Sequence, residues 1–249
     1  MRLLRSSEAR GEGRFPGLHS RHSFSFGAYV DPANEQLSVL RVLNDDRLEP
    51  GAGFPTHGHR DMEILTLVLD GTLEHRDSLG NQGAVRAGEM QVMSAGTGIR
   101  HSEFNGSREA PMRFLQIWIL PDASGHAPRW QQVDTAALAG AGGVTRMVGP
   151  WASGAPLEVH QDVRVDLLRL TGGQALDLDP APGRVRYLHV ARGTLGLDGR
   201  PLGDGDAVAV DGEAVLQLVA GPEGGDALLF DLPPGRVALT GLDLDERAA

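Results

Sequence analysis

Short apolar runs, each bounded by turn-forming residues, recur along the whole chain and constrain its fold more than any other feature. They are rich in Val, Leu and Ile, and Gly, Pro, Asp or Asn stands at their ends. The runs are Leu37–Leu43, Glu63–Leu69, Ala110–Leu120, Val163–Leu170, Arg186–Val190, Ala207–Val210, Ala214–Val219 and Ala227–Leu232. The 34 glycines supply many turns between them. This pattern predicts an all-β fold, either a sandwich or a barrel of antiparallel strands.

The two halves of the chain repeat one order of features. In each half a strand ends at a Gly-Thr-Leu triplet, Gly71–Leu73 in the first half and Gly193–Leu195 in the second, and a Gly-acid turn follows. The repeat predicts two similar domains, residues 1–137 and 138–249. The stretch Gly140–Gly154 is rich in Gly and Pro and is expected to link them.

Helical periodicity is weak throughout the sequence. The best candidate is Gln131–Ala139, where Asp134 would cap the first turn of a short helix. Among the aromatic residues, Phe24, Phe26 and Trp118 are expected in the core. Trp130 is expected to hold the two domains together.

Composition excludes several classes of chemistry. All 23 basic residues are arginine and the chain has no cysteine, so lysine Schiff bases, thiolate nucleophiles and iron–sulfur clusters are excluded. The net charge is −10 and neither half is basic, which argues against direct binding to nucleic acid. No apolar run is long enough to span a membrane, and the first residues do not form a signal peptide. We therefore expect a cytoplasmic monomer with no membrane partner.

Two pairs of residues have the spacing of metal ligands on a strand. His57 and His59 form one pair, and His101 and Glu103 form the other. Residues i and i+2 of a strand point to the same face, so each pair aims two donors into one interior. Three imidazoles and one carboxylate suit a divalent Fe, Mn, Co, Ni, Cu or Zn ion. Glu63 is a competing carboxylate that could instead be an outer partner of the site.

The spacing around these residues resembles the two motifs of the cupin superfamily. The first motif reads Gly51-(five residues)-His57-x-His59-(three)-Glu63-(seven)-Gly71, with one extra residue before the last Gly. The second reads Gly88-(five)-Ser94-x-Gly96-(four)-His101-(three)-Asn105, with Ser in place of Pro and a longer step to His. Flanking segments resemble the pirin branch of the cupins, most closely its bacterial quercetinase-like members. These segments are His22–Phe26, Gly53–Pro55, His101–Glu103 and Gln116–Ile119.

The resemblance implies a bicupin, two stacked antiparallel β-barrels of the double-stranded β-helix (jelly-roll) type. It places the metal in the N-terminal domain, bound by residues matching His57, His59, His101 and Glu103, and it does not make Glu63 a ligand. Matching the second half to the first puts Asp179, Ala181 and Leu218 at the histidine positions. The resemblance therefore implies a C-terminal domain without metal ligands.

The resemblance also implies an activity. Quercetinase-like pirins are dioxygenases that open the ring of a flavonol such as quercetin with loss of carbon monoxide. Iron(II) is the expected metal, although Zn, Mn, Co, Ni and Cu also suit the ligands, and Glu103 is the expected base that deprotonates the phenolic substrate. The alternative is a metal- and redox-dependent regulatory protein that binds a protein partner and has no catalytic role.

Overall fold

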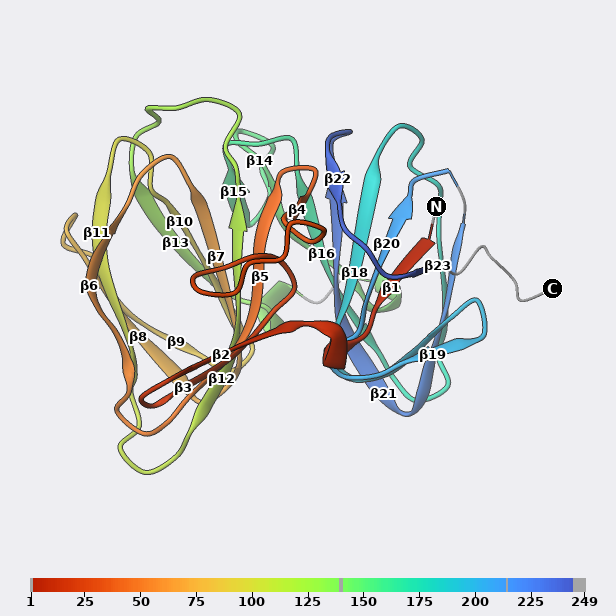
Figure 1. Ribbon diagram of the computed structural model, residues 1–249, viewed down its shortest axis with the longest axis horizontal. Helices are drawn as coiled ribbons and strands as arrows, with labels where there is room; N and C mark the ends of the chain where they lie inside the picture. Colours follow the sequence, from red (N-terminus) through yellow and green to blue (C-terminus); the bar gives the residue numbers. More distant parts are fainter. Residues whose placement is uncertain (1, 139–140, 214, 244–249) are drawn as a thin grey trace.

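The computed structural model describes residues 2–138, 141–213 and 215–243, which form two β-rich units lying side by side (Figure 1). The only helical elements among these residues are short 3-10 turns. They are η1 (Ser7–Ala9), η2 (Ala136–Leu138) and η3 (Ala141–Gly143). The predicted all-β bicupin fold is confirmed. None of the helices in the described part of the chain is long and apolar enough to cross a membrane.

The N-terminal unit has two sheets that face each other. The larger contains β2 (Gly11–Phe15), β3 (Leu18–His22), β4 (Gln36–Leu37), β5 (Leu40–Leu48), β7 (Glu63–Asp70), β10 (Glu89–Ser94), β12 (Met112–Ile119), β13 (Arg129–Asp134) and β22 (Val237–Ala238). Its main order is β13-β10-β7-β12-β5-β3-β2. The smaller sheet contains β6 (Gly53–His59), β8 (Thr72–Asp77), β9 (Gln82–Arg86) and β11 (Ile99–Asn105), in the order β6-β11-β8-β9.

The C-terminal unit is one large, folded sheet. It contains β1 (Arg2–Arg5), β14 (Val144–Pro150), β15 (Leu157–Val159), β16 (Arg164–Leu170), β17 (Ala175–Leu178), β18 (Val185–Leu197), β19 (Arg200–Leu202), β20 (Ala207–Asp211), β21 (Leu216–Leu232) and β23 (Leu242–Asp243). The ends of the chain cross between the units, since β1 pairs with β20 and β22 pairs with β4. The division into residues 1–137 and 138–249 stays a prediction.

Alternation along β5 and β12 gives these strands two different faces. Asn44, Asp46 and Gln116 point into the N-terminal unit, where they line a cavity. Leu43 and Leu115 point the other way and pack in a core shared with the C-terminal unit. Because successive strand residues face opposite sides, the larger sheet is the wall between the cavity and the interface of the two units.

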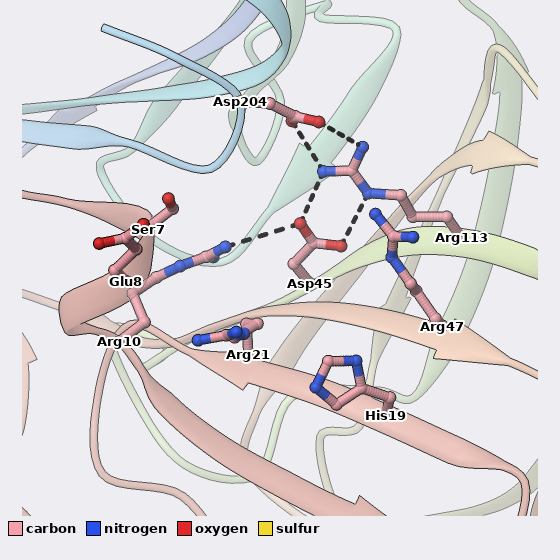
Figure 2. A pocket seen from close by; sticks show the side chains of 9 residues that line it. All are labelled: Ser7, Glu8, Arg10, His19, Arg21, Asp45, Arg47, Arg113 and Asp204. Atoms are coloured by element: carbon pink, nitrogen blue, oxygen red, sulfur yellow. Dashed lines mark hydrogen bonds and ion pairs between the residues drawn. The ribbon is translucent and has the colours of Figure 1, made fainter.

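Arg113 joins the two units by ion pairs at the edge of this shared core. Its guanidinium donates two hydrogen bonds to Asp45, at 2.9 and 2.7 Å, and two to Asp204 of the C-terminal unit, at 3.0 and 2.8 Å (Figure 2). Arg113 and Asp45 are both buried. A buried carboxylate that loses its cation is left poorly compensated.

We therefore expect Arg113→Met to lower the free energy of unfolding by about 3–5 kcal/mol. The matched control is Arg146→Met, which breaks the more exposed pair with Asp166 and should cost about 1 kcal/mol or less. Urea denaturation followed by circular dichroism measures both. Equal losses of unfolding free energy in the two variants would show that the buried Arg113 contacts stabilise the fold no more than the exposed Arg146 pair.

His189 on β18 is fully buried between the units, and neither ring nitrogen has a hydrogen-bond partner among the described residues. Burial, and next the nearby positive charge of Arg10, lowers its pKa to about 3. In the unfolded chain the pKa is about 6.5. Between these values the unfolded state binds a proton that the folded state does not bind, so stability falls as the pH drops from 6.5 toward 3.

Replacing this imidazole with a leucine of similar size should remove that dependence. We expect the unfolding free energy of His189→Leu to fall less steeply with decreasing pH than that of the wild type, by about 1.4 kcal/mol per pH unit at most. Urea denaturation at pH 7, 6 and 5 measures the two slopes, and other histidines contribute equally to both proteins. Identical slopes would contradict the prediction.

Three local predictions are wrong. Gln131 lies in strand β13, which pairs with β10, and only the η2 turn follows it; Asp134 does accept a hydrogen bond from the Ala136 N–H, and Ala139 lies outside the described residues. The expected linker contains β14, whose buried Met147 and Val148 belong to the shared core. The runs Ala214–Val219 and Ala227–Leu232 lie largely in one long strand, β21, and Ala214 is outside the description. Cross-strand pairing outweighed local turn and helix signals in each case.

Candidate metal centre

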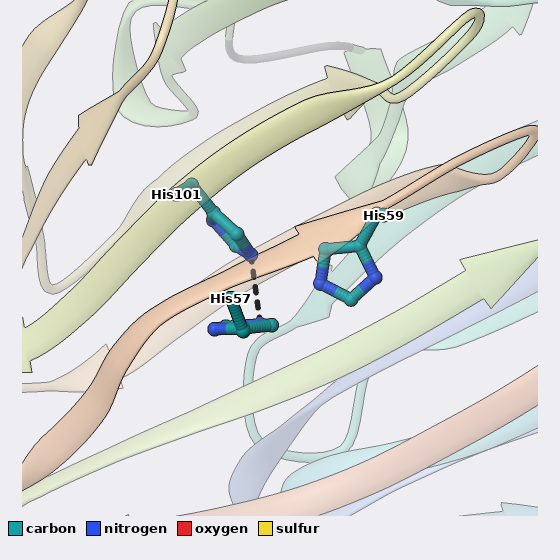
Figure 3. Close-up of side chains that lie close together, drawn as sticks. All are labelled: His57, His59 and His101. Carbon is teal, nitrogen blue, oxygen red and sulfur yellow. Dashed lines mark hydrogen bonds between the residues drawn. The ribbon is translucent and has the colours of Figure 1, made fainter.

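Strands β6 and β11 bring His57, His59 and His101 together. His101 is the direct cross-strand partner of His57, and His59 follows on the same face of β6. Ligand nitrogens of all three rings lie within 4.8 Å of one another. Figure 3 shows the imidazole of His101 pointing across to His57, with His59 beside them. The predicted i, i+2 pairing and the spatial convergence of the three histidines thus agree.

The ring nitrogens of these histidines suit a cation. Nδ1 of His57 donates a hydrogen bond to the carbonyl oxygen of Pro55 at 2.8 Å, which leaves Nε2 of that ring with its lone pair. This Nε2 lies 3.1 Å from Nε2 of His101. Burial lowers the pKa of His59 to about 4 and that of His101 to about 2, with further lowering by the neighbouring imidazoles. Imidazole nitrogens that converge on one point fit a divalent metal.

Glu103 is fully buried beside His101 and is held by two amides. Gln91 donates to one carboxylate oxygen at 2.7 Å and Gln116 donates to the other at 3.0 Å. Burial raises the pKa of Glu103 to about 7, and the two amide hydrogen bonds partly oppose this shift. The ligand atoms of Glu103, His75 and His101 lie within 4.8 Å of one another and form a second cluster, separate from that of His57, His59 and His101. A carboxyl group with a pKa near neutrality can accept and hold a proton.

His75 is a member of this cluster that the sequence analysis did not find. It lies on β8 directly opposite Glu103, and its ring stacks on Trp130 with centroids 5.3 Å apart. Its Nε2 is 3.3 Å from the carboxylate of Asp77. A single histidine in a strand has no local motif, so only the pairing of β8 with β11 could have revealed it. Trp130 thus packs within the N-terminal unit, and the expectation that it joins the domains is wrong.

A cavity of about 460 Å³ opens beside His57 and His59. One wall is apolar and largely aromatic, and includes Phe15, Leu18, Phe26, Phe54, Pro55 and Trp118. Trp118 packs edge-on against His59 at 5.1 Å between centroids, and Phe26 packs edge-on against Trp118 at 5.3 Å. Phe24 is buried as expected, whereas Phe26 is only partly buried and lines the cavity. Trp118 packs against the buried cluster that includes Ile64 and Met93 but also lines the cavity, so the expectation that it belongs to the core holds in part. The polar lining includes Ser20, His22, Asn44, Asp46 and Gln116.

Two further residues of the motif have structural roles. Glu63 accepts a hydrogen bond from Ser94 at 2.6 Å and lies outside both histidine groups of the described chain. Gly53 allows β6 to approach β11, because a Cβ there would lie 2.3 Å from the carbonyl oxygen of Glu103. Between the pairs His101–His57 and Glu103–Phe54, β6 has one residue more than β11, so the bulge lies in β6.

The interior of the C-terminal unit is apolar where the N-terminal unit carries ligands. Leu218 is fully buried in a cluster that includes Leu188, Leu195 and Leu197. No group of candidate metal ligands occurs in the described part of this unit. The position matched to His101 thus serves as a packing residue.

Comparison with known proteins agrees with this arrangement. The Pirin family matches residues 4–119, and the quercetinase C-terminal cupin domain matches residues 147–232. The chain is 42% identical over 234 residues to a quercetin 2,3-dioxygenase of Escherichia coli strain K12, which covers 94% of this chain and 100% of that protein.

Solved structures show the same relationship. The crystal structure of YhhW from Escherichia coli has a TM-score of 0.88 at 40% identity, covering 94% of this chain and 98% of that one. The bacterial pirin YhhW in complex with nickel(II) has a TM-score of 0.87 at 41% identity, covering 94% of this chain and 100% of that one. An oxalate decarboxylase of Lactobacillus farciminis shares only the fold, with a TM-score of 0.66 at 15% identity over 93% of this chain and 86% of that one. Identity and fold agree over nearly the whole length, and this chain belongs to the pirin family.

Proposed function

We propose that this protein is a metal-dependent dioxygenase that cleaves flavonols such as quercetin, with iron(II) as its metal. The proposal rests on one observation, the convergence of three imidazoles, with the buried carboxylate of Glu103 next to one of them, beside an aromatic-walled cavity. The name of the Escherichia coli relative, quercetin 2,3-dioxygenase, supports the same activity. The cavity volume of about 460 Å³ lies within the range usual for small-molecule sites.

His57, His59 and His101 would hold the metal, and we propose Glu103 as the fourth ligand. The bound ion would supply a centre at which an oxidisable substrate and dioxygen are held side by side. Histidine and carboxylate donors are typical of non-haem iron(II) oxygenases, which favours iron. The nickel(II) complex of the related YhhW supports a divalent ion at such a site.

The residues of the chain position the substrate and receive its proton. Phe26, Phe54 and Trp118 form flat apolar walls on which an aromatic ring can stack. Glu103 would accept the proton of a phenolic hydroxyl, since its carboxylate lines the cavity and its burial, which raises its pKa, favours holding that proton afterwards. Gln91 and Gln116 fix the carboxylate for this transfer.

The test is the loss of flavonol absorbance by iron-loaded protein in air, run in parallel with oxygen consumption. We expect both signals in air and neither under argon. Metal-loaded protein that consumes no oxygen with any phenolic substrate would refute the proposal. It would favour the alternative of a metal-dependent regulatory protein that binds a protein partner.

A further inference from the structure

A second cavity, of about 250 Å³, lies on the opposite side of the larger sheet from the metal centre. Five basic side chains line it, together with three carboxylates, Glu8, Asp45 and Asp204 (Figure 2). We call it the arginine groove, and its basic residues are Arg10, His19, Arg21, Arg47 and Arg113. We propose that the arginine groove binds a small anion that carries phosphate or carboxylate groups.

Strand register creates the groove. On three adjacent strands, His19 of β3 is the direct partner of Arg47 on β5, and Arg47 is the direct partner of Arg113 on β12. Like charges directly opposite each other on a sheet are destabilising unless something compensates them. The same register places Arg21 beside Asp45.

Not all of these cations are neutralised by the protein. Asp45 and Asp204 satisfy Arg113. Arg47 is exposed and has no ion-pair or hydrogen-bond partner among the described residues, and Arg21 has only a 4.0 Å contact with Glu12, an acid that also pairs with Arg14 and His19. An anion would therefore find two guanidinium groups with unused donors.

Arg10 is the strongest sign of a built site. Its side chain is 2% exposed, and its single ion pair in the described chain is a 3.6 Å contact with Asp45. Its Nε and Nη1 atoms have no hydrogen-bond partner among the described residues. Buried donors without a partner are costly, and Figure 2 shows this guanidinium directed into the groove. Because these two donors are themselves enclosed, Arg10 contributes positive charge to the groove rather than an exposed donor.

The arginine groove and the metal cavity lie on opposite faces of strand β5. Asp45 and Arg47 of β5 face the groove, whereas Asn44 and Asp46 line the metal cavity. A ligand of the groove would therefore not compete with substrate for space. Planar guanidinium groups bind carboxylates and phosphates through paired hydrogen bonds, and the volume suits a phosphate ester or a small di- or tricarboxylate.

Isothermal calorimetry on the full-length, metal-loaded protein tests the proposal, with inorganic phosphate and tricarballylate as separate probes at constant ionic strength. We expect saturable 1:1 binding of at least one probe. Arg47→Gln and Arg21→Gln should each weaken it about 10-fold, as expected for loss of a charge-assisted hydrogen bond. The matched control is Arg200→Gln, an equal loss of charge at an exposed position outside the groove, which should leave the affinity unchanged.

The pattern of results separates the sources of the anion. Binding of phosphate alone indicates a phosphorylated ligand, and binding of tricarballylate alone indicates a carboxylate ligand; both support the proposal. No saturable binding, or binding that neither Arg47→Gln nor Arg21→Gln weakens more than Arg200→Gln, overturns it. An anion that binds at the metal instead of in the groove would give the latter outcome, because neither Arg47→Gln nor Arg21→Gln would weaken its binding more than Arg200→Gln. No flavonol is present, so the result is independent of the proposed dioxygenase activity.

Discussion

Replacing His101 with alanine is expected to weaken metal binding by more than about 100-fold and to abolish oxygen-dependent turnover. Loss of a residue that merely supports a ligand costs about 10–100-fold in metal affinity. His101 contributes a donor nitrogen directly, and it belongs to both groups of candidate ligands. Removing it leaves His57 and His59 on one strand, with no imidazole opposite them on β11.

Metal analysis of protein loaded with iron(II) under anaerobic conditions, then passed through a desalting column, measures this effect. The matched control is His126→Ala, which removes a partly exposed histidine paired with Asp122 outside both ligand groups. This control should retain metal and turnover. A His101→Ala protein that retains metal at the wild-type stoichiometry would contradict the three-histidine centre.

The Glu103→Gln variant is expected to lose about 10²- to 10⁴-fold in kcat/KM, the usual contribution of a positioned general base. The amide that replaces the carboxylate cannot accept the substrate proton. In the wild type, Gln91 and Gln116 each donate to one carboxylate oxygen of Glu103. In the variant, the new N–H₂ group would face one of these two amide donors. We expect the metal to remain bound when supplied in excess, because the three imidazoles are unchanged.

Steady-state kinetics with a flavonol and metal analysis on the same preparation measure both quantities. The control is Glu74→Gln, an exposed carboxylate on β8 next to His75, which should not change turnover. Turnover at the wild-type rate in Glu103→Gln would exclude Glu103 from proton transfer. Turnover that excess metal fully restores would make Glu103 a ligand without a role as base.

Some of the site could be predicted because its geometry is local. His57 with His59, and His101 with Glu103, share a face because strand side chains alternate, whatever the rest of the chain does. The turn at Gly71 is also local, because its φ of +83° favours glycine at that single position. The absence of lysine and cysteine likewise restricted the chemistry to histidine and carboxylate before any fold was known.

Other parts of the site depend on residues that are far apart in sequence. Trp118 has the same apolar surroundings in sequence as a core residue, but the packing of β12 opposite β6 makes it a wall of the cavity. The strand β13 forms because β10 offers it a partner along its whole length, which a local helix signal cannot reveal. The continuous β21 likewise forms because β18 pairs with it on both sides of the stretch 221–224, at Ala220 and at Gly225.

By itself, the sequence determined the fold class, the family and the two pairs of candidate ligands, since alternation, turns and motif spacing act over a few residues. The tertiary structure alone decided that His75 lies opposite Glu103 and that Gln91 and Gln116 hold its carboxylate. It alone brought Arg10, Arg47 and Arg113 around one groove. These contacts depend on strand register, and a shift of one residue would turn every side chain to the other face.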